Sequence, residues 1–543
     1  MHAATLATRA FVLLFVASGH SVAQSPAPPP APQVTVGAGL KLLQFDWEPA
    51  PRATFYMLLH KPDAASPFAV YGNPILAPRA RAALTIPVHT LDWANARYKV
   101  LACNESGCPN SPELSVQDLM LPSIGYVKAS NPDPFDGFGR FLVLSQDGNT
   151  LVTSSHDDSN SIENEADNSS EDSGAVYIFR RIGAGWRQEK YLKSGRNQPQ
   201  QQFGIGYPMG HRALAVSGNG MVVAVGAPRE RVNGVEDAGA VYLFVRDIPG
   251  AWNFANDGIM LPSPQPLDFF GTSVDLNDDG SVLKVTSLAP YDANGHPTGT
   301  TYIYQRTETG WTLSGGGIPA EPGDRFCGSQ MSGDGGVIVS LCDNAVTGAI
   351  IRSRRPYYGG AQDIPLPSYH SQQPALSGNS ARMAVLTTNA AGARVVNVYG
   401  WTGSTWVRET QLPSPAGTAT DYPSWGEALA FNRNGTMLAI GDHTNSSGGV
   451  GVSDAPLPPN TPPPFNKDGA VFVYRRESSG WTLSRVVKAP NASHIDSFGR
   501  DIALSGNGLT LAIGAPAEDS GARGVDGNQA DNSKPSAGAI YLY

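Results

Sequence analysis

The feature that most constrains this chain is a strand pattern that recurs from residue 135 to the end of the sequence. "FGRFLVLSQDGNTLVTSS" (138–155), "FGIGYPMGHRALAVSGNGMVVAVGAP" (203–228) and "FGRDIALSGNGLTLAIGAP" (498–516) each run from an aromatic–Gly pair through two apolar strands joined by a Gly-containing turn. Third strands follow at 174–179, 239–244, 300–305, 469–474 and 538–543, and fourth strands begin at Trp186, Trp252, Trp311, Trp406 and Trp481. Four strands repeated every roughly 45–70 residues are typical of β-propeller blades.

Seven such units are predicted, and the last of them is incomplete. The units start at Phe138, Phe203, Phe270, Phe326, His370, Trp425 and Phe498. The seventh reaches only its third strand at Tyr543, whereas "YVKASN" (126–131) matches "VVKAPN" (486–491), the end of a complete fourth strand. We therefore expect an all-β chain with a seven-bladed β-propeller over 119–543, closed by a strand at 121–128. Closure removes an edge whose N–H and C=O groups would otherwise lack partners.

The aromatic–Gly starts and the "GAP" motifs at 226–228 and 514–516 resemble the FG-GAP repeats of integrin α-chain propellers, especially those of secreted bacterial relatives. The resemblance covers about three quarters of the chain. It implies calcium in the hairpin between first and second strands, on a D-x-D-x-D-G-x-x-D loop. Here those hairpins, such as "SQDGNT" and "LNDDGS", carry one or two carboxylates. Since Ca²⁺ takes six to eight oxygens, we expect tight turns there and no family calcium site.

The N-terminal residues predict export. Residues 1–23 combine an early Arg9, an apolar core and a small-x-small "SVA" ending, which is the pattern of a secretory signal peptide. Residues 24–32 are Pro-rich and are predicted to form a stiff linker. No other stretch is apolar over about 18 residues, so no transmembrane segment is expected. The mature protein is predicted to be secreted, periplasmic or at the cell surface.

Residues 33–118 contain short alternating strands separated by Pro-rich turns, which is a β-sandwich pattern. The placement of Trp47, Tyr56 and Tyr98, with "YKVLACNESGC" near the end, resembles a fibronectin type III domain. The resemblance implies that Trp47 packs in the core and that Tyr98 begins the penultimate strand. Such a module usually spaces or presents other domains.

The four cysteines fall in two close pairs. Cys103 and Cys108 flank a tight turn, and Cys327 and Cys342 flank a predicted hairpin centred on "SGDGG" (332–336). Residues opposite each other on paired strands lie about 4.5–5.5 Å apart at Cα, which a disulfide can bridge. We predict a disulfide for each pair; buried free thiols or a metal site are the alternatives.

Long acidic insertions between second and third strands mark one sector of the predicted ring. They occupy 156–173, 442–468 and 517–537, in blades one, six and seven, which closure makes neighbours. Rigid scaffolds usually place recognition on such loops. The candidate ligand-binding residues are Asp157, Asp158, Glu163, Glu165, Asp167, Asp172, Glu518, Asp519 and Asp526. Of these, Asp157, Asp158, Glu163, Asp172 and Asp519 are candidate Ca²⁺ ligands; solvated acidic loops without metal are the alternative.

Two recurring residue types have a binding and a structural interpretation. The aspartates of Asp-x-Phe starts, such as Asp136 and Asp496, either ring one face or cap the turn into the inner strand. The tryptophans that begin fourth strands are either sugar platforms or packing residues. The structural interpretation is favoured for both.

The composition and the absence of certain motifs argue against some classes of function. A net charge of −9 without any basic run argues against nucleic-acid binding. No G-x-S-x-G or H-E-x-x-H motif is present, and the ten His are scattered. The leading prediction is a monomeric interaction or adhesion-type protein that binds an extracellular protein or glycan through the loops of blades six, seven and one. The alternatives are an extracellular hydrolase or lyase acting on polymers, and a structural envelope component.

Overall fold

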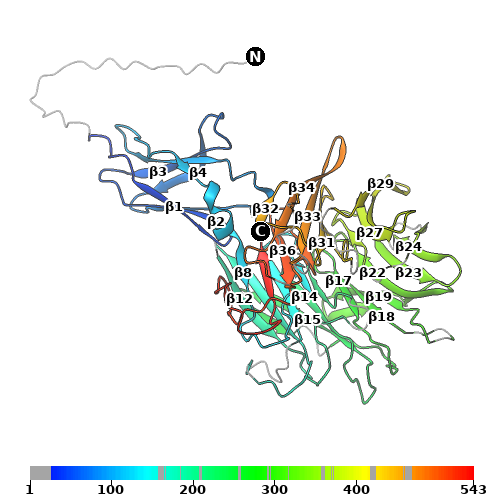
Figure 1. The fold of residues 1–543 in the computed structure, drawn as a ribbon. Coiled ribbons are helices and arrows are strands. Elements are labelled where there is room, and N and C mark those ends of the chain that lie inside the picture. Colours follow the sequence, from blue (N-terminus) through cyan, green and yellow to red (C-terminus); the bar gives the residue numbers. More distant parts are fainter. Residues whose placement is uncertain are drawn as a thin grey trace, which may run out of the picture.

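The computed structural model shows an all-β molecule with two parts (Figure 1). The predicted signal peptide and the first residues of the linker lie outside the described residues. The structure describes residues 26–156, 164–165, 167–183, 185–206, 211–254, 258–289, 291, 293, 295–315, 317–355, 361–368, 370, 372–415, 423–456, 458, 468–493 and 495–543. Within these residues, no helix is long and apolar enough to cross a membrane.

The N-terminal part is a sandwich of two antiparallel sheets. One sheet has the order β1 (Val34–Gly39), β2 (Leu42–Trp47), β5 (Arg81–Thr85), and the other has the order β4 (Ala69–Leu76), β3 (Phe55–Lys61), β6 (Arg97–Cys103), β7 (Leu114–Ser115). Short 3₁₀ helices follow, η1 (Val88–Thr90) within the sandwich and η2 (Gln117–Leu119) after it. Trp47 is buried against Tyr56, and Tyr98 lies buried in the penultimate strand, as predicted.

The C-terminal part contains seven described sheets, one for each predicted repeat, and we number them in chain order. Sheet 1 contains β9 (Leu142–Leu144), β10 (Thr150–Ser155), β11 (Ala175–Ile182) and β12 (Gly185–Leu192). Sheet 2 contains β13 (Leu214–Val216), β14 (Val222–Ala227), β15 (Ala240–Ile248) and β16 (Ala251–Phe254). Sheet 3 contains β17 (Ser273–Leu276), β18 (Val282–Ser287), β19 (Thr300–Thr307), β20 (Gly310–Leu313) and β21 (Ile318–Pro319).

The other four sheets have the same antiparallel order. Sheet 4 contains β22 (Asp324–Met331), β23 (Ile338–Asn344), β24 (Gly348–Arg354) and β25 (Ala361–Pro365). Sheet 5 contains β26 (Ala375–Leu376), β27 (Arg382–Thr388), β28 (Arg394–Trp401) and β29 (Trp406–Pro413). Sheet 6 contains β30 (Ala428–Phe431), β31 (Met437–Asp442), β33 (Ala470–Glu477), β34 (Gly480–Lys488) and β32 (Gly451–Ser453). Sheet 7 contains β35 (Ile502–Leu504), β36 (Leu511–Ala515), β37 (Ala539–Leu542) and β8 (Gly125–Val127).

The seven sheets form a closed ring. Their innermost strands β9, β13, β17, β22, β26, β30 and β35 contact one another in this order, and β35 contacts β9. Five of the aromatic residues that start repeats are buried beside their sheets, as Phe138 is against Tyr177; they are Phe138, Phe203, Phe270, Trp425 and Phe498. The innermost strands are therefore held around a common axis.

The ring is closed by β8, which pairs with β37 over Gly125–Val127. The strand is shorter than the predicted 121–128, because Leu121–Ser123 form the 3₁₀ helix η3. Asn131, just after β8, accepts a hydrogen bond from Tyr177 of sheet 1 at 2.6 Å. Asn491, just after β34, accepts the equivalent bond from Tyr541 at 2.6 Å. The segment after β8 therefore contacts sheet 1 in the same way as the segment after β34 contacts sheet 7.

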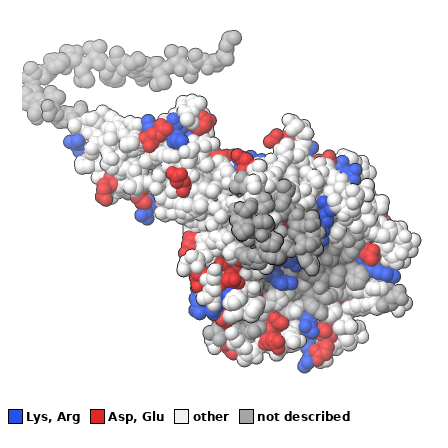
Figure 2. All heavy atoms as spheres, in the orientation of Figure 1, with Lys and Arg blue, Asp and Glu red and all other residues white. Residues whose placement is uncertain are grey.

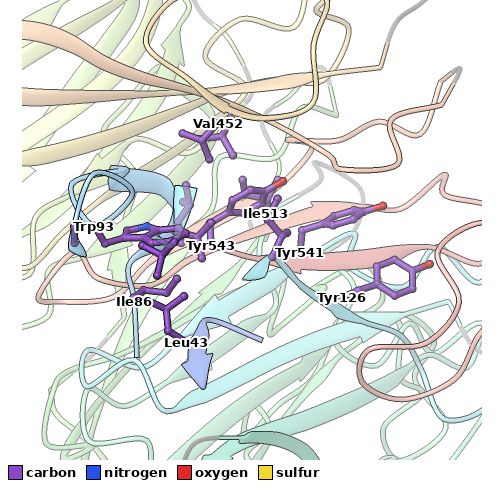
Figure 3. Packing of buried hydrophobic residues seen from close by; sticks show 14 of the residues in the cluster. Leu43, Ile86, Trp93, Tyr126, Val452, Ile513, Tyr541 and Tyr543 are labelled. Atoms are coloured by element: carbon purple, nitrogen blue, oxygen red, sulfur yellow. The ribbon is translucent and has the colours of Figure 1, made fainter. Parts of the chain in front are cut away.

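The sandwich packs against sheets 6 and 7. Leu43, Ile86 and Trp93 of the sandwich share one buried cluster with Ile513 and Tyr543 (Figure 3). Lys41 is also buried there, and its ammonium group donates to the backbone oxygens of Leu509 and Tyr543. The Lys41 contacts lie at the end of sheet 7 at which the first strand turns into the second, and Val452 of the sheet 6 insertion belongs to the same buried cluster.

The described parts of two insertions reach the outer edges of their sheets. In sheet 6 the insertion contributes β32, which pairs with the outermost strand β34. In sheet 7, Val525 forms a bridge with Val127, and the Lys128 N–H donates to the Gly524 carbonyl at 2.7 Å. Backbone N–H and C=O groups at an exposed strand edge gain partners in this way.

Both predicted disulfides are present. Cys103 is bonded to Cys108, and Cys327 to Cys342 across the hairpin of β22 and β23. The alternative of free thiols is excluded, because the structure contains no free cysteine. The only described group of potential metal ligands is Asp324 with Cys327 and Cys342, and there both sulfur atoms belong to the disulfide.

Candidate functional site

The acidic residues predicted for the sheet 1 insertion do not form a cluster in its described part. Asp157, Asp158 and Glu163 lie outside the described residues. The Glu165 carboxylate accepts a hydrogen bond from Ser130, and Asp167 accepts one from the Ser169 N–H at 3.1 Å. The Asp172 carboxylate lies 3.5 Å from Nδ1 of His156.

The acidic residues predicted for the sheet 7 insertion mainly hold that insertion together. Glu518 is buried, and its carboxylate accepts hydrogen bonds from the Tyr126 hydroxyl at 2.6 Å and the Lys128 ammonium at 2.8 Å. The Asp519 carboxylate accepts from the Ser536 N–H at 2.8 Å. The exposed Asp526 faces the closing strand, where its carboxylate accepts from the Tyr126 N–H at 3.4 Å. Glu518 therefore stabilises the closed ring and is not a surface ligand-binding group.

The hairpins between first and second strands are tight turns, as the low carboxylate count predicted. Asp147, Asn219 and Asn507 each accept a hydrogen bond from the N–H two residues further on, at 2.9, 3.0 and 2.9 Å. Their side-chain oxygens are thus used within the turn. Calcium binding by Asp157, Asp158, Glu163, Asp172 and Asp519 remains a prediction, since three of these five residues lie outside the described part.

The structural interpretation of the Asp-x-Phe starts is confirmed. Asp136, Asp268 and Asp496 each accept a hydrogen bond from the backbone N–H three residues earlier, at 2.8, 2.6 and 3.1 Å. Each aspartate therefore caps the turn that leads into an inner strand. Among the fourth-strand tryptophans, Trp186, Trp252 and Trp406 are buried, as expected of packing residues.

The site that the structure itself indicates is a cavity of about 520 Å³ on the ring axis, at the face where inner strands begin. Its volume is in the range of small-ligand sites. The polar residues lining it come from several sheets: Arg140 and His156 (sheet 1), Gln202 and Arg212 (sheet 2), Gln330 (sheet 4), Gln372 and Gln373 (sheet 5), Glu427 (sheet 6), and Arg500 and Asp501 (sheet 7).

Two of the three arginines in this wall have acidic partners. Arg212 binds Asp501 through two nitrogens, at 2.6 and 3.3 Å. Arg500 donates to Glu427 at 2.9 Å, and Arg394, just outside the wall, donates to the other oxygen of the same carboxylate at 3.1 Å. These carboxylates hold the guanidinium groups in place, because charge-assisted hydrogen bonds fix orientation as well as distance.

Arg140 differs from these arginines because its guanidinium group makes no hydrogen bond or ion pair with any described residue. The guanidinium carbon lies 6.0 Å from the centre of the Phe141 ring, which is a cation–π contact. Burial, and then the positive charge of Arg500, lower the pKa of Arg140. Among the described residues that line the cavity, three guanidinium groups and two carboxylates leave one excess positive charge, in a chain whose net charge is −9. Such a wall favours an anionic group, and Arg140 has donors available for it.

Two histidines lie beside these charges. His443 approaches Glu427 at 3.8 Å; burial, and then Arg500 and Arg394, lower the pKa of His443 to about 3. It is therefore neutral at physiological pH. His156 lines the cavity, and Asp172 lies 3.5 Å away.

Sequence reasoning missed this cavity, although the repeats contain a signal for it. Arg140 and Arg500 occupy the same position in "FGR" (138–140 and 498–500), and Glu427 occupies it in "WGE" (425–427). Residues directly after the aromatic–Gly pair thus reach the axis. On the face shown in Figure 2, acidic and basic side chains are interspersed.

Comparisons with known proteins leave the family open. No family model matches the chain, and no curated protein matches it. Solved structures that resemble it include the periplasmic gluconolactonase PpgL of Pseudomonas aeruginosa, with 13% identity and a TM-score of 0.36 over 80% of this chain and 96% of that one. A protein from Lactobacillus plantarum has 13% identity and a TM-score of 0.38 over 80% and 97%. TolB from Acinetobacter baumannii has 12% identity and a TM-score of 0.30 over 70% and 79%. At such TM-scores these similarities decide neither the fold nor the activity of this chain.

Proposed function

We propose that this chain is an exported binding protein that takes an acidic group of an extracellular protein or glycan into the axial cavity. The single observation that carries the proposal is Arg140, a half-buried guanidinium without an acidic partner among the described residues, beside arginines that have one. A carboxylate or phosphate of a ligand would supply the missing partner, and a bidentate bond would orient it.

The rest of the proposed architecture follows the sequence motifs. The ring is proposed to be a seven-bladed propeller of the FG-GAP type over 119–543, and the sandwich over 33–118 to be a fibronectin type III-like module. The signal peptide and linker at 1–32 would deliver the chain, as a monomer, to the periplasm, cell surface or medium. No residue of the sandwich is among the described residues that line the cavity.

Binding of labelled oligogalacturonate and of a labelled poly-glutamate peptide to the full chain tests the proposal. We expect Arg140→Gln to weaken binding of at least one probe more than tenfold. Arg306→Gln is the matched control, because Arg306 is exposed on β19 and its side chain has no described partner. The melting temperature of Arg140→Gln should not fall, since the substitution removes a charge that burial disfavours. Equal binding by both variants would contradict the proposal.

A second candidate function is a lyase or hydrolase acting on an acidic polymer. The observation that favours it is His156, which lines the cavity next to the Asp172 carboxylate. A histidine oriented by a carboxylate is a common proton acceptor, and Arg140 and Arg500 would hold the acidic group of the substrate. The test is turnover of a panel of polyuronates. Turnover that is lost in His156→Asn but kept in His296→Asn would support this function over simple binding, because His296 lies outside the cavity wall.

A further inference from the structure

The part of the cavity wall around Arg140 holds more positive charge than one carboxylate can balance. Arg394 and Arg500 share a single acidic partner, because they donate to the two oxygens of Glu427 at 3.1 and 2.9 Å. The guanidinium group of Arg140 has no acidic partner among the described residues. Three guanidinium groups therefore stand against one carboxylate, which leaves an excess of two positive charges.

Arg140 and Arg500 are close enough to act on each other. They occupy equivalent positions in sheets 1 and 7, which are neighbours in the ring because β9 contacts β35. Burial, and then the positive charge of Arg500, lower the pKa of Arg140, and no carboxylate contributes to this shift. An anion bound between the two guanidinium groups would relieve their repulsion.

The other charged groups near this corner of the wall do not cancel the excess. Arg212 and Asp501 form a neutral pair with each other. His443 is uncharged at physiological pH, since its pKa is lowered to about 3 by burial and then by the neighbouring arginines. Asp172 lies beside His156, and its side chain is 45% exposed, so water and salt screen its charge.

An excess of two positive charges matches a doubly charged anion. A carboxylate or a sulfate ester carries one negative charge. A phosphate monoester carries nearly two at pH 7.5, because its second pKa is about 6. It also presents three acceptor oxygens, to which guanidinium groups bind in a bidentate manner.

We propose that the acidic group taken into the axial cavity is a phosphoryl dianion, bound between Arg140 and Arg500. This inference rests on the proposed function, because it uses the same cavity and the same arginine. It adds the chemical class of the bound group, which is shared by phosphate monoesters and free phosphate. It also assigns Arg394 a role in specificity, since Arg394 adds positive charge without lining the cavity.

Calorimetric titration of the full chain at pH 7.5 with three sugar acids tests the inference. Glucose 6-phosphate, glucose 6-sulfate and glucuronate carry their acidic groups at the same carbon of the same sugar, and only the first is a dianion. We expect glucose 6-phosphate to bind more than tenfold more tightly than either monoanion. Inorganic phosphate is the fourth probe: binding as tight as that of the sugar phosphate would identify the free anion as sufficient, and weaker binding would identify an ester. Both results support a phosphoryl dianion.

Two variants test the role of the charges. Arg140→Gln should weaken binding of glucose 6-phosphate more than tenfold. Arg394→Gln should reduce the preference for glucose 6-phosphate over glucose 6-sulfate about fivefold, because it removes one charge at a distance from the ligand. A purely structural role of Arg394 would weaken both ligands equally and leave this ratio unchanged. Arg306→Gln is again the matched control, and it should change neither the affinities nor their ratio.

The outcomes separate this inference from the proposed function. If glucose 6-phosphate binds no more tightly than glucose 6-sulfate, or does not bind, the phosphoryl dianion is wrong. The proposed function then still stands if Arg140→Gln weakens binding of oligogalacturonate or of the poly-glutamate peptide. If Arg140→Gln changes the binding of none of these probes, both proposals fail.

Discussion

Sheets 2 and 7 each have a buried glutamate at the same position of the repeat. The residues that donate hydrogen bonds to it are near in sequence in sheet 2 and far away in sequence in sheet 7. Glu230 and Glu518 are the fifth residues of "GAPRE" (226–230) and "GAPAE" (514–518). Glu230 accepts hydrogen bonds from nearby residues, the Tyr242 hydroxyl at 2.8 Å and the Gln201 amide at 2.6 Å. Glu518 accepts from Tyr126 and Lys128, which are 392 and 390 residues away.

The comparison shows how a repeated local motif can serve two purposes. In sheet 2 the buried carboxylate stabilises one sheet and the connection that precedes it. In sheet 7 the same carboxylate holds the closing strand β8, so its hydrogen bonds connect the two ends of the ring. We therefore expect equivalent substitutions to have unequal effects in the two sheets.

The largest effect is expected from Lys128→Met. This variant leaves the buried Glu518 carboxylate without its cation, and breaking a buried ion pair costs about 3–5 kcal/mol. The free energy of unfolding, measured by urea denaturation, should fall by this amount. The double variant Lys128→Met/Glu518→Leu should recover much of the loss, because no unpaired charge remains. A double variant as unstable as the single one would contradict the role given to Glu518.

A smaller and directly matched effect is expected from Tyr126→Phe and Tyr242→Phe. Each removes one hydroxyl that donates to a buried carboxylate, which is worth about 1.5–3 kcal/mol. Susceptibility to proteolysis should increase more for Tyr126→Phe, because only that hydroxyl belongs to the closing strand. Equal proteolysis of the two variants would show that closure does not depend on this network.

The last effect concerns pH and sheet 7 alone. Burial, with the nearby charges of Glu518 and Asp519, raises the pKa of Asp496 to about 6, although the Ser493 hydrogen bonds oppose the shift. Because the folded state holds this proton more tightly than the unfolded state, the stabilisation is present below about pH 4 and is lost as pH rises through 6, by on the order of 2–3 kcal/mol. Asp496→Asn should flatten the stability profile over this range and raise the melting temperature at pH 7. An unchanged profile would contradict the assignment.

The sequence predicted the elements that local patterns encode. Alternating strands, hairpin turns, the cysteine pairs and the match between 126–131 and 486–491 each involve a short stretch, and they led to the repeated sheets, the two disulfides and a closing strand that the structure limits to Gly125–Val127. The direction of the insertions could not be predicted, because acidic residues such as Glu518 occur equally in solvated loops and in buried networks. The Tyr126 and Lys128 partners become visible only once the ring is closed.

The axial cavity was missed for a related reason. Its described wall takes only one or two polar residues from each of six sheets, so no continuous motif describes it. The arginines of "FGR" at 138–140 and 498–500 could have suggested it. Their significance depends on knowing that the residue after the aromatic–Gly pair faces the axis and that Arg140 has no acidic partner among the described residues.

The position of β8 ahead of the ring also sets the order in which this protein can mature during biosynthesis. Its partner β37 is synthesised hundreds of residues later, so sheets 1 to 6 can assemble while the closing strand is still unpaired. The sandwich must wait as well, because its contacts with Ile513 and Tyr543 form only when those residues are available. A nascent chain therefore exposes both the open ring and the uncovered surface of the sandwich until β37 has been synthesised, and this interval is when it most needs protection from aggregation.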